Sequence, residues 1–85
     1  MIQKEIQLKS NAGLQAKSAA EFIQKASCYK ASIWLEKDEK KANAKSLLGL
    51  LALEISSNDK LAIIADGVDE GTAVNELSDY LLLNV

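Results

Sequence analysis

The chain has 85 residues, of which 48 % are hydrophobic and 26 % charged, and its formal net charge is −2 at pH 7. A chain of this length buries too little surface for a second core, so we expect one globular domain over residues 1–85. The lysines and acidic residues are spread along the sequence without a basic stripe, and no apolar run reaches the roughly 18 residues of a membrane span, so we expect a cytoplasmic protein with no direct nucleic-acid or membrane binding.

The first predicted strand spans residues 2–9. Apolar and polar side chains alternate there, as a half-buried strand requires, and the apolar face holds Ile2, Ile6 and Leu8. The small residues of Asn11–Gly13 predict a turn into a helix. One apolar stripe on that helix is made by Ala19, Phe22, Ile23 and Ala26. We expect this helix to end near Ser27–Tyr29.

Two strands and a short helix are predicted next. The apolar face of the first strand holds Ala31, Ile33 and Leu35, and the charged KDEKK segment predicts a hairpin into a short strand over residues 40–43. The segment SLLGLLAL is too apolar for a solvated loop and does not alternate, so it predicts a helix over residues 46–53 that begins at Ser46. Gly49 weakens that helix by roughly 1 kcal/mol relative to alanine.

The last two predicted elements are a strand and a helix. Residues 60–67 form a β-branched run that ends at Gly67, which predicts a fourth strand. Asp69 is a candidate N-cap for the helix that follows, whose apolar stripe holds Val74, Leu77 and Leu81.

The element order is therefore βαββαβα. It predicts an α+β open-faced sandwich, in which a four-stranded antiparallel sheet carries three helices on one face. Trp34 is out of phase with the apolar face of its strand. We expect it to project from the open face of the sheet, where it is a candidate partner anchor.

The chain contains no histidine and one cysteine, Cys28. Histidine is the commonest metal ligand and the usual base of hydrolytic triads, so we expect neither a His-based zinc site nor a triad, and no cofactor. A lone cysteine forms no internal disulfide, which fits a reducing compartment. We expect Cys28 to be a small, half-buried residue near a helix end.

Three segments resemble the HPr family, the phosphocarrier proteins of the bacterial sugar phosphotransferase system. These are GLQAKSAAEFIQKA, NAKSLLGLLAL and ADGVDEGTAVNEL, and the resemblance extends over essentially the whole chain. The NAKS motif with its following GL is the more specific part. In the family, the first segment reads GLHARPAA, and its histidine carries the phosphoryl group. The matching position here is Gln15, whose carboxamide is not nucleophilic, so the resemblance implies that no phosphocarrier chemistry occurs there.

The histidine-lacking Crh branch of this family also has glutamine at that position. The resemblance to Crh (catabolite repression HPr-like) implies a regulatory protein that is phosphorylated on a serine by HPr kinase/phosphorylase. The phosphoprotein then binds a CcpA-type repressor as its corepressor in carbon catabolite repression. Ser46 matches that serine within its motif.

The chain departs from the family pattern beside Gln15. The branch keeps GLQARPAA, whereas this chain has Lys17 and Ser18 and no arginine at all. Lysine meets a phosphate as a point charge and cannot make a planar two-pronged contact, so we expect the repressor contact to be weakened or redirected. Ser18 and Glu21 also form an S-x-x-E capping pattern that favours a later helix start.

The predicted regulatory site centres on Ser46. A hydroxyl at a helix start is ordinarily an N-cap contributing about 1 kcal/mol, and a phosphate there meets backbone N–H groups and the positive end of the helix dipole. A short helix cannot bury all of its leucines on one face. We expect an apolar patch, flanked by Lys17 or Lys45, that is made by Leu47, Leu48 and Leu51.

Two alternative functions remain open on the sequence. One is a degenerate HPr paralogue that binds metabolic or transport enzymes through its leucines independently of phosphorylation. The other is a phosphocarrier with a different acceptor, Cys28 or Ser18. The oligomeric state is also open, because exchange of an N-terminal strand between two copies would turn a monomer into a domain-swapped dimer.

Overall fold

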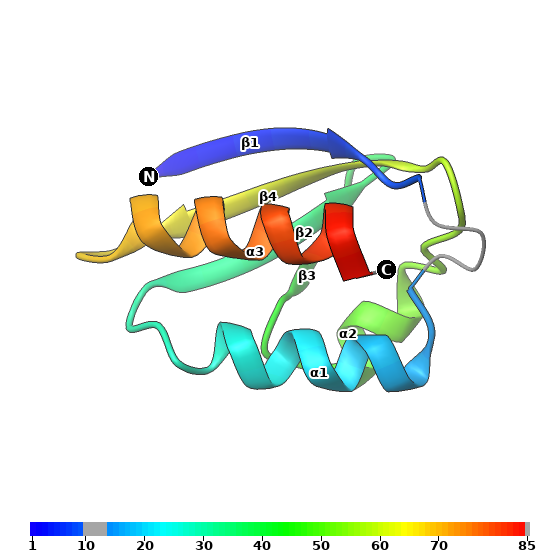
Figure 1. The fold of residues 1–85 in the computed structure, drawn as a ribbon, viewed down its shortest axis with the longest axis horizontal. Coiled ribbons are helices and arrows are strands. Elements are labelled where there is room, and N and C mark those ends of the chain that lie inside the picture. The colour runs from blue at the N-terminus through cyan, green and yellow to red at the C-terminus, as the bar shows by residue number, and fades with distance from the viewer. Residues whose placement is uncertain (10–13, 85) are drawn as a thin grey trace.

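The computed structural model describes residues 1–9 and 14–84 (Figure 1). These residues form four strands and three helices in the predicted order. The elements are β1 (Ile2–Gln7), α1 (Ala16–Ala26), β2 (Ser32–Lys37), β3 (Lys40–Asn43), α2 (Leu47–Ala52), β4 (Lys60–Asp66) and α3 (Glu70–Asn84). The turn predicted at Asn11–Gly13 lies outside the described residues.

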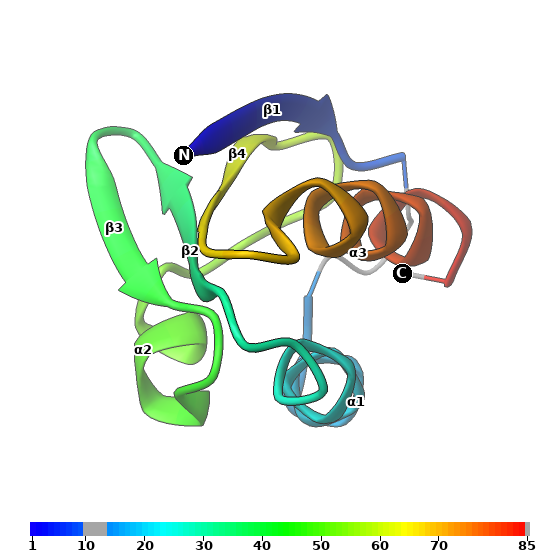
Figure 2. The ribbon, with the colours of Figure 1, turned by 90° about the vertical axis from the view of Figure 1, so that its left-hand side faces the viewer.

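The four described strands form an antiparallel sheet in the order β1-β4-β2-β3. The central strand β4 pairs with β1 on one side and with β2 on the other, so β1 and β3 are the edges. In Figure 2 the three helices lie on the same side of the sheet. The predicted open-faced α+β sandwich is confirmed.

The core lies between the sheet and the helices because each element directs its apolar residues to this layer. Alternate residues of the strands point into it, and the helices contribute one stripe each. Its fully buried large side chains include Phe22 of α1, Leu50 of α2, Leu77 and Leu81 of α3, and Ile33, Leu35 and Ile63 of the sheet. The apolar faces predicted for the strand before the hairpin and for the last helix are confirmed.

The hairpin between β2 and β3 turns at Asp38 and Glu39. Both residues have positive φ, at 51° and 68°. Two successive positive φ values are typical of the tight turns whose twist matches that of the paired strands. The register that follows pairs Lys37 with Lys40 and Leu35 with Ala42. The predicted hairpin is confirmed.

Some side chains on the open face of the sheet are partly covered by their neighbours on adjacent strands. Trp34 is half-buried there, in one row with Asn43 of β3 and Ile64 of β4. The ammonium of Lys41 lies 5.7 Å from the centre of the Trp34 ring, within range of a cation–π contact. Trp34 therefore has the predicted orientation, but its ring is partly covered by neighbouring strands.

The expectation of a half-buried Cys28 is wrong, because Cys28 is exposed. The buried stripe of α1 consists of Ala19, Phe22 and Ala26. Two residues beyond Ala26, the chain has turned about 200° away from that stripe at 100° per residue. The thiol donates a hydrogen bond to the carbonyl oxygen of Gln24 at 3.4 Å.

The junction between β4 and α3 is held against the start of β2. Asp69 stands immediately before α3, as predicted, but its carboxylate accepts hydrogen bonds from the N–H groups of Lys30 at 2.8 Å and Ala31 at 2.9 Å. The Lys30 N–H, followed by that of Ala31, lowers the pKa of the Asp69 carboxyl below its ordinary value. Asp69 thus joins two segments that are distant in sequence.

Gly67 makes this junction possible. Its φ is 158°, and a Cβ at this position would lie 2.6 Å from the Cα of Ala31. A side chain here would demand both a backbone conformation that L residues rarely adopt and a shift of the neighbouring backbone. Glycine is therefore required where β4 passes β2.

Within the described part of the chain, no helix has the combination of length and apolarity that crossing a bilayer would need.

Gly67→Ala should lower the free energy of unfolding by about 3 kcal/mol or more, because backbone strain and overpacking add together. Gly71→Ala is the matched control: a Cβ there meets only the end of the Ile2 side chain, at 3.8 Å. The control should leave stability unchanged or slightly higher. Urea unfolding followed by Trp34 fluorescence measures both variants, and equal stabilities would contradict this view of the junction.

Candidate functional site

Ser46 is the N-cap of α2. Its backbone is extended, with φ −117° and ψ 116°, and its Oγ accepts a hydrogen bond from the N–H of Gly49 at 3.2 Å. Its carbonyl oxygen accepts from the N–H of Leu50 at 3.0 Å, which begins the helical hydrogen bonding. The predicted start of this helix is confirmed. Ser46 is half-buried, so part of the residue remains accessible to solvent.

Asn43 fixes the approach of the chain to Ser46, a role that the sequence analysis did not assign. The Asn43 side-chain oxygen accepts from the N–H of Lys45 at 2.8 Å, and its carbonyl oxygen accepts from the N–H of Ser46 at 3.0 Å. An asparagine that bonds the backbone two residues on forms an Asx turn. The sequence did contain a signal for this turn: an asparagine ends the predicted strand, two residues before Lys45 and three before Ser46.

The leucines of α2 and of its C-cap, Leu53, divide into two sets. Leu50 and Leu53 are buried in the core. The other three are exposed, and we call them the leucine patch: Leu47, Leu48 and Leu51, with 40 %, 80 % and 38 % of their surfaces accessible. A six-residue helix offers the core one face, so the remaining leucines must meet solvent. The predicted exposure of these three residues is confirmed.

Lys45 precedes Ser46, but its ammonium is engaged elsewhere. Its Nζ donates to the carbonyl oxygens of Tyr29 at 2.9 Å and Ala31 at 3.1 Å. These carbonyls belong to the segment between α1 and β2, which Asp69 holds from its N–H side. In this conformation the lysine therefore tethers that segment, and its predicted position at the border of the leucine patch stays a prediction.

Lys17 is exposed on the first turn of α1. Helix α1 contacts α2, so Lys17 belongs to the same helical layer as Ser46 (Figure 1). Lys17 is therefore accessible to solvent, whereas the ammonium of Lys45 is bonded to backbone carbonyls.

Gln15 is the N-cap of α1, with extended backbone at φ −100° and ψ 177°. The helix begins at Ala16, so the later start favoured by the Ser18 and Glu21 pattern is wrong. Ser18 lies in the first turn, where its Oγ accepts from the N–H of Gln15 at 3.0 Å and donates to the Gln15 carbonyl oxygen at 3.1 Å. The Ser18 hydroxyl thus ties the first turn to residue 15. Glu21 instead accepts a hydrogen bond from the Tyr80 hydroxyl at 3.2 Å.

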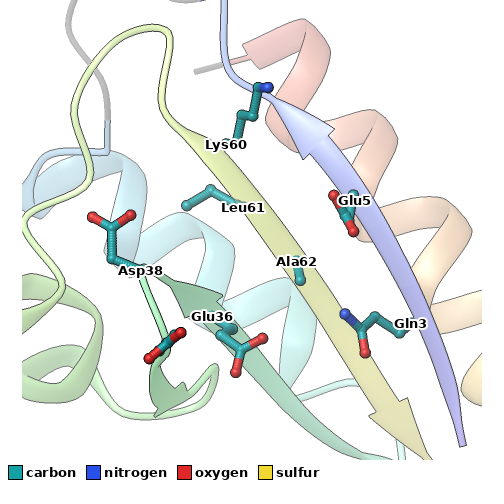
Figure 3. A pocket seen from close by; sticks show the side chains of 8 residues that line it. Gln3, Glu5, Glu36, Asp38, Lys60, Leu61 and Ala62 are labelled. Carbon is teal, nitrogen blue, oxygen red and sulfur yellow. The ribbon is translucent and has the colours of Figure 1, made fainter.

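A shallow hollow of about 200 Å³ lies on the opposite, open face of the sheet (Figure 3). Glu5 of β1 and Glu36 of β2 flank Ala62 of β4 in one cross-strand row. Among the described residues, no group of His, Cys, Asp or Glu has an arrangement that could hold a metal ion. This hollow is therefore an acidic surface separate from the α2 site.

Comparison with known proteins places the chain in a family. The family model described as the PTS HPr component phosphorylation site matches residues 2–82. The phosphocarrier protein HPr of Borreliella burgdorferi is 41 % identical over 81 residues, which cover 95 % of this chain and 94 % of that protein.

The HPr-like protein Crh of Bacillus subtilis is equally similar, at 41 % identity over 81 residues that cover 95 % of both chains. A crystal structure of Bacillus subtilis Crh, described as a domain-swapped dimer, has a TM-score of 0.77 and covers 95 % of this chain and 93 % of that one. Overall identity thus does not separate the Crh branch from the carriers.

The structure of HPr-C-His from Thermoanaerobacter tengcongensis superimposes with a TM-score of 0.91 at 41 % identity, covering 95 % of this chain and 91 % of that one. The family match, these relatives and the shared fold agree. The chain belongs to the HPr family, whose relatives include both phosphocarriers and Crh proteins.

Proposed function

We propose that this chain is a non-catalytic, cytoplasmic HPr-like regulatory protein. HPr kinase/phosphorylase phosphorylates Ser46, and the phosphoprotein binds a CcpA-type repressor as a corepressor in carbon catabolite repression. The observation that carries this proposal is the position of the half-buried Ser46 at the start of α2, next in sequence to the leucine patch. The similarity to Crh supports the choice of partners.

The modification is a phosphoryl transfer from ATP. A bond forms between Ser46 Oγ and the γ-phosphorus, the bond from that phosphorus to its bridging oxygen breaks, and ADP leaves. The hydroxyl proton passes to a base of the kinase. The product places about −1.5 to −2 charges where α2 presents N–H groups, so the fold can accommodate it.

The leucine patch and the phosphate together make a two-part recognition surface. Exposed apolar side chains supply contact area for a partner, and the phosphate makes binding conditional on modification. Lys17, exposed on the neighbouring helix, can offer a point charge to an acidic group of the partner. Two of the three N–H donors of the Lys45 ammonium are already bonded to the carbonyls of Tyr29 and Ala31.

Carrier activity at residue 15 is excluded from the proposal because a carboxamide nitrogen forms no phosphoramidate. Neither alternative acceptor replaces it well. The Ser18 hydroxyl is bonded to the backbone of Gln15, and Cys28 lies beyond the far end of α1. The 11 residues of α1, which lie between Gln15 and Cys28, alone span about 16 Å at 1.5 Å per residue.

The second candidate function is binding to a metabolic or transport enzyme without phosphorylation. The exposure of Leu48 favours it, since an 80 % exposed leucine is available to a partner whether or not Ser46 is modified.

One experiment separates the two functions. After incubation with HPr kinase/phosphorylase and ATP, the wild-type chain should gain one phosphoryl group and bind the repressor at least tenfold more tightly than the untreated chain. Ser46→Ala should gain no phosphoryl group and show no increase in affinity, at a loss of about 1 kcal/mol of stability from the missing cap. Intact-mass spectrometry and calorimetric titration provide the two measurements.

Leu48→Ser is the matched control for the leucine patch. Its side chain is largely solvated, so the variant should fold normally and be phosphorylated, yet bind the repressor more weakly. Equal repressor binding by the treated and untreated wild-type chain would contradict the regulatory proposal and support the second function.

We also propose that two copies can exchange β1. This strand is an edge of the sheet and pairs with β4 through six residue pairs, from Ile2 with Ala65 to Gln7 with Lys60. A second copy can supply the same pairs, and the dimer described for Bacillus subtilis Crh supports this assembly. The alternative assembly is the monomer.

Sedimentation velocity tests the exchange. Dimers formed at high concentration should persist for hours after dilution, because separating exchanged strands requires unfolding both chains. A dimer that dissociates within seconds would instead indicate contact between intact surfaces.

A further inference from the structure

Gly49 occupies the third position of α2, next to Ser46. Glycine in a helix lowers stability by about 0.8–1 kcal/mol relative to alanine. Glycine is usually found at such a position because the residue has a positive φ or because another part of the backbone passes close to it. Among the described glycines, Gly67 alone has a positive φ in this structure. The backbone of α2 therefore does not require glycine at position 49.

The packing of the unmodified protein does not require it either. A Cβ at position 49 would lie 3.4 Å from Ser46 Oγ, 3.5 Å from Ser46 Cβ and 3.5 Å from the Cβ of Ala42. These are ordinary van der Waals distances. An alanine would fit without displacing its neighbours and would strengthen the helix.

The space that a side chain at residue 49 would fill lies next to the Ser46 hydroxyl oxygen. Two of its three nearest neighbours belong to Ser46, and one of them is the hydroxyl oxygen itself. The N–H of Gly49 also donates to that oxygen. A phosphoryl group on Oγ brings three further oxygens, and an oxygen that takes over the bond from this N–H comes close to the position that a Cβ of residue 49 would occupy.

We propose that Gly49 is the residue that makes Ser46 modifiable: the missing side chain leaves room for the phosphoryl group beside Oγ. The inference rests on the proposed phosphorylation of Ser46 and assigns a determinant to it. Glycine then lowers the stability of α2 in the unmodified protein, but it allows the phosphoryl group to fit beside Ser46. Ala42, the other neighbour, is buried and pairs with Leu35, so core packing already accounts for its small size.

A thermodynamic cycle tests this without the kinase. Four proteins are compared, carrying serine or cotranslationally installed phosphoserine at position 46, each with and without Gly49→Ala. With serine, Gly49→Ala should raise the melting temperature by a few degrees. With phosphoserine, the same substitution should lower it, because the methyl group and the phosphate compete for one space. The signature is this reversal of sign.

The kinase reaction gives a second readout. Gly49→Ala should reduce kcat/KM for phosphorylation of Ser46 at least tenfold. Ala52→Gly, at the exposed end of the same helix, is the control: it weakens α2 without crowding Ser46, and should keep kcat/KM within about threefold of wild type.

The outcomes separate the inference from the proposed function. If Gly49→Ala raises the melting temperature equally with serine and phosphoserine, or is phosphorylated as fast as wild type, the inference is overturned while the function stands. If the kinase leaves wild-type Ser46 unmodified, the proposed function fails. The cycle still decides whether residue 49 limits the space for a phosphate.

Discussion

The hydrogen bond from the Gly49 N–H to Ser46 Oγ caps the start of α2. The exposed surface beside Ser46 results from the short length of this helix. Six helical residues present one face to the core, which takes Leu50. The leucine patch is left in solvent beside the capping hydroxyl. The same few residues thus create an apolar contact area and a modifiable group at its edge, and we propose that regulation depends on this combination.

Much of the fold could be predicted from local patterns. Alternation identified β1 and β2, the charged turn identified the hairpin, and an apolar run beginning with serine identified α2 and its cap. Each of these signals lies within a few residues, where strand and helix periodicity act directly. The exposure of Leu47, Leu48 and Leu51 followed from the same reasoning, because the predicted helix over residues 46–53 carries five leucines, which cannot all lie on one face.

The contacts that the sequence analysis missed join distant segments. The Asp69 carboxylate bonds the backbone before β2, and the Lys45 ammonium bonds the same segment from its carbonyl side. The hydrogen-bond partners of these backbone groups depend on which distant segments pack together in the fold, and no local sequence pattern shows this. Ser18 is a different case, because its bonds to the Gln15 backbone are local: the S-x-x-E pattern pointed to Ser18 as the cap, but the helix begins at Ala16 and Ser18 lies in its first turn.

The central claim is that an HPr scaffold is retained here without a phosphocarrier group at position 15. The most direct measurement is incubation with phosphoenolpyruvate and the transferase that acts upstream of HPr, followed by detection of acid-labile phosphate. The wild-type chain should remain unlabelled, while Gln15→His should gain an acid-labile phosphoryl group. Acid-labile label on the wild-type chain would contradict the account.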